Sequence, residues 1–255
     1  MKIAVCVKHA IDEAELKVDA GGTPQFAGAA SKMSTFDKNA VEEALRLKGT
    51  HSGDVTLLTV GTAEAKKTMK EALAMGADRG VLVAVDPMSI DTGRTAELLA
   101  ASAKKAGPFD LVLCSEGSSD IYSGLVPPML GELLGLPYVG YAKKIEVTGQ
   151  SAKVERSLED SVEVVEASLP LVVSIVSEIN EPRYPTLIQI MQAGKKPIEE
   201  VTPESILPGS KPATPQFVGM KAQAMARKKL VFEGPPEETA KKLVDALASE
   251  GVIPR

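Results

Sequence analysis

The polar residues best suited to ligand binding form one loop near the middle of the chain. The loop consists of Ser115, Glu116, Gly117, Ser118, Ser119, Asp120, Ile121, Tyr122, Ser123 and Gly124, and it continues into Leu125 and Val126. It follows an apolar run typical of a buried strand, and ligands bind beyond the carboxyl ends of such strands in open parallel sheets. Small residues let the backbone approach an anion, and hydroxyl and N–H groups can donate to it. The loop therefore predicts a phosphate or nucleotide site, with an ordinary serine- and glycine-rich connection as the alternative.

A second group of small polar residues stands before a predicted helix that starts near Lys38. The group comprises Ser34, Thr35, Phe36 and Asp37. Ser34 and Asp37 approximate the spacing of a capping box, although Glu or Gln is the usual partner, so a plain helix N-cap and a ligand contact are both open. Phe36 has polar neighbours, which leaves two roles for its ring: an exposed contact for a ligand or partner, or a buried hydrophobic staple.

No arrangement of residues indicates catalysis or a metal site. The histidines, His9 and His51, have no acid or base partner at a recognisable spacing, and the cysteines, Cys6 and Cys114, lie in separate apolar runs. No Gly-x-Gly-x-x-Gly follows the first predicted strand, and no P-loop occurs. These patterns favour binding or carrying of a nucleotide over its turnover.

The composition indicates a soluble globular protein. The 255 residues are 44% hydrophobic and 25% charged, with a formal net charge of −5. The apolar stretches are much shorter than the roughly 20 residues that a membrane-spanning helix needs. The acidic balance, with four Tyr, five Phe and no Trp, disfavours nucleic-acid binding. Two cysteines cannot supply a disulfide framework, so we expect a reducing compartment such as the cytoplasm, with export without disulfides as the alternative.

Short apolar runs alternate with amphipathic stretches in the first half of the chain. Strands are predicted over residues 2–8, 54–60, 80–85 and 109–114, and helices around residues 40–45, 65–73 and 96–103. Strands that are apolar throughout suit burial on both faces, and short connections through helices require parallel neighbours. We therefore expect an α/β fold with an open, mainly parallel sheet and flanking helices.

The rhythm changes after about residue 138. Runs at residues 142–147, 152–158, 161–167 and 171–176, separated by turn residues, predict antiparallel strands added to the sheet. Nine of the seventeen prolines fall within residues 182–236, which predicts an extended arm that needs a partner subunit to lie on. Pro235 and Pro236 then begin a predicted C-terminal helix with one apolar stripe.

Several stretches resemble the β subunit of electron-transfer flavoproteins. They are residues 5–8 (VCVK), 40–44 (AVEEA), 74–79 (AMGADR) and 180–184 (NEPRY), in this order and spacing. The family's descriptive pattern is met at Val154, Arg156, Glu159, Asp160, Glu163, Val165, Pro170, Val172, Val173 and Ser174, with Ser161 departing from it. The resemblance covers nearly the whole chain.

The resemblance implies an adenine-nucleotide-binding type of fold and a heterodimer. A larger α subunit would hold most of a redox-active FAD, and this subunit would bury AMP, or a second FAD in electron-bifurcating members. The positions carried over as nucleotide contacts are Cys6, Ser34, Thr35, Phe36, Asp37, Val60 and every residue from Ser115 to Val126. Phe36 matches an aromatic residue that approaches the flavin.

The resemblance also implies a protein-docking segment. Leu187 matches a leucine that docks into a dehydrogenase pocket, and the predicted partner contacts are Arg183, Tyr184, Leu187, Ile188, Met191, Lys195 and Lys196. The expected division is an α/β nucleotide-binding domain over residues 1–181 with hairpins from about 140, a recognition loop and arm over 182–234, and a helix over 235–255 that packs on the partner subunit.

The function implied by the resemblance is electron carriage without a substrate of its own, from acyl-CoA-type dehydrogenases to a quinone-linked acceptor. Two alternatives stay open: an electron-bifurcating subunit with a second FAD and NADH as donor, and a non-redox adenine-nucleotide-binding regulatory module.

Two departures from the family bear on the site. Leu125, Val126 and Pro127 replace a polar or small run such as Gln-Thr-Gly, with two N–H donors lost at Pro127 and Pro128, and Ser157 stands where some members carry Glu.

Overall fold

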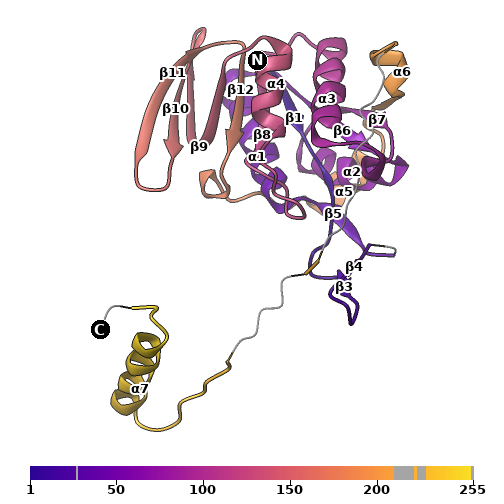
Figure 1. Ribbon diagram of the computed structural model, residues 1–255. Coiled ribbons are helices and arrows are strands. Elements are labelled where there is room, and N and C mark those ends of the chain that lie inside the picture. Colours follow the sequence, from indigo (N-terminus) through magenta and orange to yellow (C-terminus); the bar gives the residue numbers. More distant parts are fainter. Residues whose placement is uncertain (27, 210–220, 223–227, 254–255) are drawn as a thin grey trace.

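One large sheet forms the body of the protein (Figure 1). The computed structural model describes residues 1–26, 28–209, 221–222 and 228–253. In spatial order the nine strands are β11 (Val162–Ser168), β10 (Ser151–Ser157), β9 (Tyr138–Thr148), β12 (Leu171–Ile175), β8 (Leu111–Ser115), β1 (Lys2–Cys6), β6 (Asp54–Gly61), β7 (Arg79–Ala84) and β13 (Ile198–Val201). Two small two-stranded sheets accompany it, formed by β2 (His9–Ile11) with β5 (Ser31–Met33) and by β3 (Lys17–Val18) with β4 (Pro24–Gln25).

The expected α/β fold is confirmed. Every neighbouring pair from β9 to β13 is parallel, whereas β10 is antiparallel to both β9 and β11. The four strands predicted in the first half of the chain are β1, β6, β7 and β8, and their centres are buried. Continuous burial is the reason that their apolar runs identify them, because both faces of a parallel sheet are covered.

The direction of β12 corrects the prediction. Residues 171–176 were expected to form an antiparallel strand, but β12 runs parallel to both β8 and β9. Every residue of β12 is buried, which is typical of a strand in the middle of a parallel sheet. After β11 at the edge of the sheet, the chain therefore passes β10 and β9 and returns to the centre of the sheet as β12.

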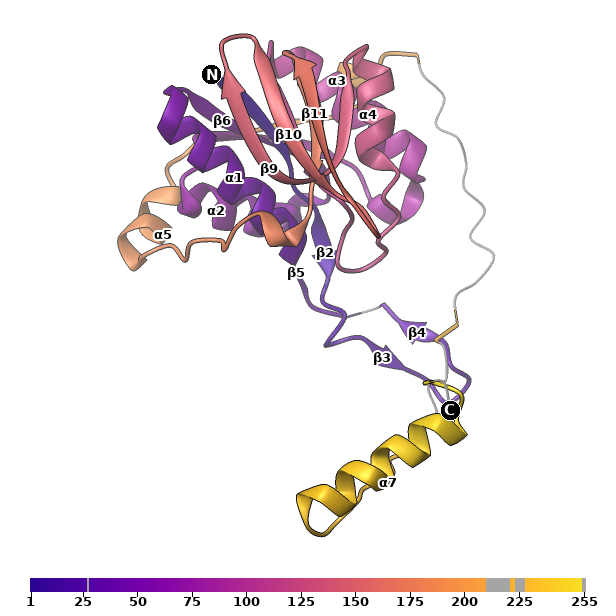
Figure 2. The same cartoon turned by 90° about the vertical axis from the view of Figure 1, so that its left-hand side faces the viewer.

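Helices cover both faces of the sheet. In Figure 2, α1 (Thr35–His51) and α2 (Lys66–Met75) lie on one side, and α3 (Thr92–Ala106) and α4 (Val126–Leu134) lie on the other. Each side has its own core: Val41 and Leu73 pack with Val5, and Leu98 and Leu130 pack with Ala4. Alternate residues of β1 thus point into different cores, as the two-residue period of a strand requires. The three short 3₁₀ helices are η1 (Ala63–Ala65), η2 (Pro87–Ser89) and η3 (Ser177–Ile179).

Part of the predicted arm is folded onto the sheet. Residues 187–206 form α5 (Leu187–Ala193), β13 and α6 (Pro203–Ile206). β13 extends the sheet beside β7, in register from Ile198 with Gly80 to Val201 with Val83. α5 packs against α2. These residues are not extended as expected, because β13 supplies backbone hydrogen bonds and Val201 buries its side chain.

The C-terminal helix is confirmed as α7 (Pro236–Ser249). It contains no buried residue, and both views place it away from the sheet. Residues 210–220 and 223–227 of the predicted arm lie outside the described residues. Among the helices of the described segments, none is both long and apolar enough to cross a lipid bilayer.

Candidate nucleotide site

A cleft of about 200 Å³ lies beyond the carboxyl ends of β1, β6 and β8. From β1 the chain adds β6 and β7 on one side of the sheet and then returns to add β8 on the other. Neighbouring connections leave the sheet in opposite directions at such a point, which opens a crevice where ligands bind. Cys6 at the end of β1 and Ser115 at the end of β8 both line the cleft.

The cleft brings together many of the residues predicted for a nucleotide. Its lining includes Cys6, Asp37, Val60, Ser115, Glu116, Gly117, Ser118, Ile121, Ser123, Gly124 and Val126. The other predicted contacts do not line it: Ser34, Thr35, Phe36, Ser119, Asp120, Tyr122 and Leu125. The loop from 115 to 126 therefore has two sides, one facing the cleft and one facing away.

Asp37 ties three elements together beneath the cleft. It is buried in the first turn of α1, where Oδ2 accepts a 2.7 Å hydrogen bond from the backbone N–H of Lys8. Its Oδ1 accepts a 2.5 Å hydrogen bond from Ser115 Oγ. Burial raises the pKa of Asp37 to about 7, although these two hydrogen bonds favour the ionised form. The carboxyl thus joins the ends of β1 and β8 to α1.

Ser34 does not form the approximate capping box that its spacing suggested. Its side chain makes no cap hydrogen bond; Ser34 Oγ instead accepts from the backbone N–H of Ser119 at 3.2 Å. Asp37, the expected partner, is held by Lys8 and Ser115. Ser34 is fully buried, so it links the two predicted polar segments to each other.

Lys8 carries a positive charge into the cleft lining, where a carboxylate compensates it. Lys8 Nζ lies 2.7 Å from Asp120 Oδ1 and 3.3 Å from Ser118 Oγ. Ser118 Oγ also donates to Asp120 Oδ1 at 2.6 Å. Burial opposes ionisation of Asp120, but the hydrogen bonds from Lys8 and Ser118 outweigh it and lower the pKa of the carboxyl. Asp120 therefore orders the loop from inside, away from the ligand space.

The N-terminus of α3 lines the cleft and was missed by the sequence reasoning. Asp91, Thr92 and Thr95 contribute to the lining, and Asp91 caps the helix by accepting from Arg94 N at 2.7 Å. The N–H groups of Thr92 and Gly93 precede the first helical hydrogen bond, so they are available to an anion. A signal existed: this segment follows the predicted strand 80–85 and so belongs at the same edge of the sheet.

The first turn of α4 offers fewer donors than that of α3. Its second and third positions are Pro127 and Pro128, which carry no N–H, and Met129 N already bonds to Leu125 O. The first turn of α4 therefore has few N–H groups to offer a ligand, whereas Asp91 and Thr92 at the start of α3 also line the cleft.

The lining of the cleft suits a polar, anionic ligand in its chemistry. Hydroxyl and backbone donors line it, and the neighbouring Ser119 Oγ is buried without a hydrogen-bond partner among the described residues. Its volume is below the roughly 300–1,000 Å³ of typical ligand pockets.

The segment predicted to dock a partner protein carries exposed apolar side chains. Leu187 is 80% exposed, Met191 78% and the preceding Tyr184 93%. A capping box between Thr186 and Gln189 begins the helix. This arrangement presents apolar groups on a short ordered helix, the form in which an anchor can enter a pocket of another protein.

The three basic residues predicted to contact a partner have different surroundings. Arg183 is paired with Glu42, and Lys196 Nζ donates to the carbonyl oxygens of Leu73 and Ala77 at 2.9 and 2.6 Å. Lys195 is exposed. Arg183 and Lys196 thus hold the segment on the domain, and Lys195 points its charge toward solvent.

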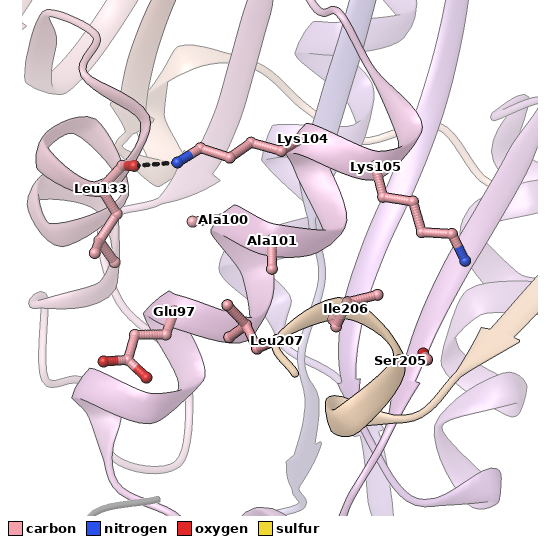
Figure 3. A pocket seen from close by; sticks show the side chains of 9 residues that line it. All are labelled: Glu97, Ala100, Ala101, Lys104, Lys105, Leu133, Ser205, Ile206 and Leu207. Carbon is pink, nitrogen blue, oxygen red and sulfur yellow. Dashed lines mark hydrogen bonds between the residues drawn. The ribbon is translucent and has the colours of Figure 1, made fainter. Parts of the chain in front are cut away.

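A second hollow, of about 550 Å³, lies on the face covered by α3, α4 and α6 (Figure 3). Ala100, Ala101, Leu133, Ile206 and Leu207 line it together with Glu97, Lys104, Lys105 and Ser205, and Lys104 Nζ donates to Leu133 O at 2.8 Å. None of the residues predicted for a cofactor or partner lies there. Within the described residues, no three His, Cys, Asp or Glu side chains are grouped as metal ligands would be.

Comparison with known proteins agrees with the resemblance seen in the sequence. The family model described as the electron transfer flavoprotein domain matches residues 25–206. The protein named electron transfer flavoprotein subunit beta from Bacillus subtilis (strain 168) is 36% identical over 256 residues, covering 99% of this chain and 100% of the relative. The chain therefore belongs to the electron transfer flavoprotein family and, within it, to the β subunits.

Proposed function

We propose that this chain is the β subunit of a heterodimeric electron carrier and has no substrate of its own. The observation that carries the proposal is the cleft at the switch point of the sheet, whose lining has hydroxyl groups that can donate to a nucleotide. An α subunit would hold most of an FAD, which supplies the redox chemistry when bound. This chain would contribute position, orientation and docking.

The nucleotide proposed for the cleft is AMP. The N–H groups of Thr92 and Gly93 and the hydroxyls of Ser118 and Ser123 would serve its anionic and polar groups, while Cys6 and Val60 would contact its apolar surface. The small volume favours AMP over a second FAD, and so favours the simple carrier over the electron-bifurcating alternative.

The partners proposed for this subunit follow from its exposed surfaces. The apolar stripe of α7, with Leu243 and Val244 exposed, would pack on the α subunit, since such a face needs a cover. Leu187 on α5 would enter a pocket of an acyl-CoA-type dehydrogenase, and Lys195 would favour an acidic surface around it. A quinone-linked protein would then accept the electrons, and the compartment would be the cytoplasm.

Co-expression with a matching α subunit tests this function. We expect a yellow complex with one copy of each chain, and denaturation should release one FAD and one AMP per complex. Release of two FAD and no AMP would assign the chain to the bifurcating type instead. A colourless β monomer that binds AMP and ignores the α subunit would contradict the electron carrier and favour a regulatory module.

A further inference from the structure

We infer that Tyr122 and Tyr141 form an aromatic surface beside the cleft, on which the isoalloxazine ring of the flavin held by the α subunit lies. The inference rests on the proposed function and names the residues of this chain that face the ring. Tyr122, predicted as a nucleotide contact, is absent from the cleft lining and is 52% exposed. Tyr141 is 44% exposed.

Tyr122 is built into its position by the residues around it. Its ring meets Phe36 edge to face, with ring centres 5.4 Å apart and an interplanar angle of 64°. On another side it lies against Gly117, where a Cβ atom would come 2.7 Å from Tyr122 Cδ2. A glycine is needed for this approach, and the ring is thus held in place while much of it stays open to solvent.

Tyr141 reaches the same region through a bulge in the sheet. Ser115 and Ala142 both align with Ile175 of β12, so the residue before Ala142 lies level with the start of the polar loop. Val139 and Ala142 of β9 pair with Val173 and Ile175 of β12, so β9 contains one extra residue here, which makes a β-bulge. Within the bulge, Tyr141 N donates to Ser174 Oγ at 3.2 Å. Bulges of this kind redirect a side chain. The two tyrosines are close enough that Tyr141 contributes to the raised pKa of Tyr122, after burial and the contact with Glu116.

Both tyrosines adopt a backbone conformation that large residues avoid. The φ angles are +53° at Tyr122 and +59° at Tyr141. This region is unfavourable for a residue with a side chain, and such strain persists where the surrounding structure enforces it, often at functional sites. Two strained, exposed aromatic rings in one place therefore indicate a surface with a role beyond folding.

A flat aromatic ring is the partner that this surface suits. Exposed tyrosine rings offer stacking and edge contacts to another ring system. Ile121 and Leu125 add exposed apolar area on the same loop. In a flavoprotein family, the flat ring that a partner subunit would bring to the rim of a nucleotide cleft is the flavin.

Flavin fluorescence in the purified heterodimer tests the inference. A photoexcited flavin takes an electron from a tyrosine in contact with it and returns the electron at once, so emission is quenched without net reaction. Phenylalanine keeps the ring shape but does not donate. We expect Tyr122→Phe and Tyr141→Phe each to produce a fraction of complexes whose flavin fluorescence lifetime is severalfold longer. The double variant should have the longest lifetime. Tyr184→Phe, on the docking segment, is the matched control and should leave the lifetime unchanged.

Gly117→Ala provides an independent variant, because the added methyl group would push the Tyr122 ring aside. It should lengthen the lifetime as Tyr122→Phe does, with FAD still bound. Unchanged lifetimes in both tyrosine variants, in a yellow complex with one copy of each chain, would overturn the inference and leave the proposed function standing. Weaker α–β association with an unchanged flavin lifetime would also overturn it, since the rings would then contact protein. Failure of the wild-type chain to form a flavin complex would remove the proposed function, and the inference with it.

Discussion

Arg183 and Glu42 form a two-point ion pair between segments 141 residues apart in the sequence. Arg183 Nε lies 2.7 Å from Glu42 Oε2 and Nη2 lies 2.9 Å from Oε1, while the backbone N–H of Arg183 donates to Oε2 at 3.1 Å. Beside it, Asn180 Nδ2 donates to Glu43 Oε2 at 3.1 Å. The loop that leads to α5 is therefore tied to α1 by side chains that α1 keeps largely buried.

Glu42→Gln should loosen this attachment without changing the shape of the side chain. Hydrogen bonds to charged groups contribute about 1.5–3 kcal/mol to stability. Because Arg183 is partly exposed, we expect the loss of stability in this variant to lie near the lower end of that range. Hydrogen exchange over residues 183–193 should accelerate more than in the rest of the domain. Glu178→Gln, at an exposed site nearby, is the control; equal exchange in both variants would show that the ion pair does not order the loop.

Lys196→Met should destabilise the other end of the docking segment. Its ammonium group caps the C-terminal end of α2, where a positive charge is favourable. We expect the free energy of unfolding to fall by about 1–2 kcal/mol. Lys195→Met is the matched control, because Lys195 is exposed; it should leave stability unchanged and weaken the salt dependence of docking. Equal stability losses would contradict the separate roles of these neighbours.

Asp37→Asn should change how stability depends on pH. The pKa of Asp37 is raised from 3.8 to about 7 in the folded protein, so between these values the folded state holds a proton that the unfolded state releases. Protonation of Asp37 therefore contributes to the free energy of unfolding in full below about pH 4, and this contribution disappears as pH rises through 7. Its total is roughly 4 kcal/mol. Denaturant unfolding at pH 5 and pH 8 should show a smaller difference in Asp37→Asn than in the wild type. The exposed Asp245→Asn should retain the wild-type slope, and a wild-type slope in Asp37→Asn would disprove the assignment.

Leu187→Ala should slow electron transfer from the dehydrogenase that reduces the complex, because it removes an exposed apolar anchor from α5. The rate should fall at limiting concentrations of the carrier and recover toward the wild-type value at saturation, with bound FAD unchanged. Val164→Ala, exposed on β11, offers a control of similar size. Loss of flavin from Leu187→Ala would place the leucine at the subunit interface and not at the docking site.

The local features of this fold could be predicted from the sequence because they depend on neighbouring residues. The run around Val5 is apolar throughout because the strand is covered on both faces. The stripe that contains Val41 and Ala44 has helical spacing because these side chains of α1 pack into the core on one face of the sheet. The polar loop at the end of β8 could be located in the same way, since its position follows from the strand before it.

The direction of β12 could not be predicted in this way, because a short apolar strand has the same pattern in either orientation. The partners of Ser34, Lys8 and Arg183 were equally out of reach. They are Ser119, Asp120 and Glu42, and each pair is brought together only when the sheet and its covering helices have packed.

By itself, therefore, the sequence determined the alternation of strands and helices, the edge of the sheet where polar loops gather, and the family. Tertiary structure decided which side of the polar loop faces the cleft, that the start of α3 also lines it, and that residues 187–206 fold onto the domain. The physical reason is one of range: periodicity and turn chemistry act over a few residues, whereas hydrogen bonds, ion pairs and ring contacts depend on atoms that the chain brings together from distant positions.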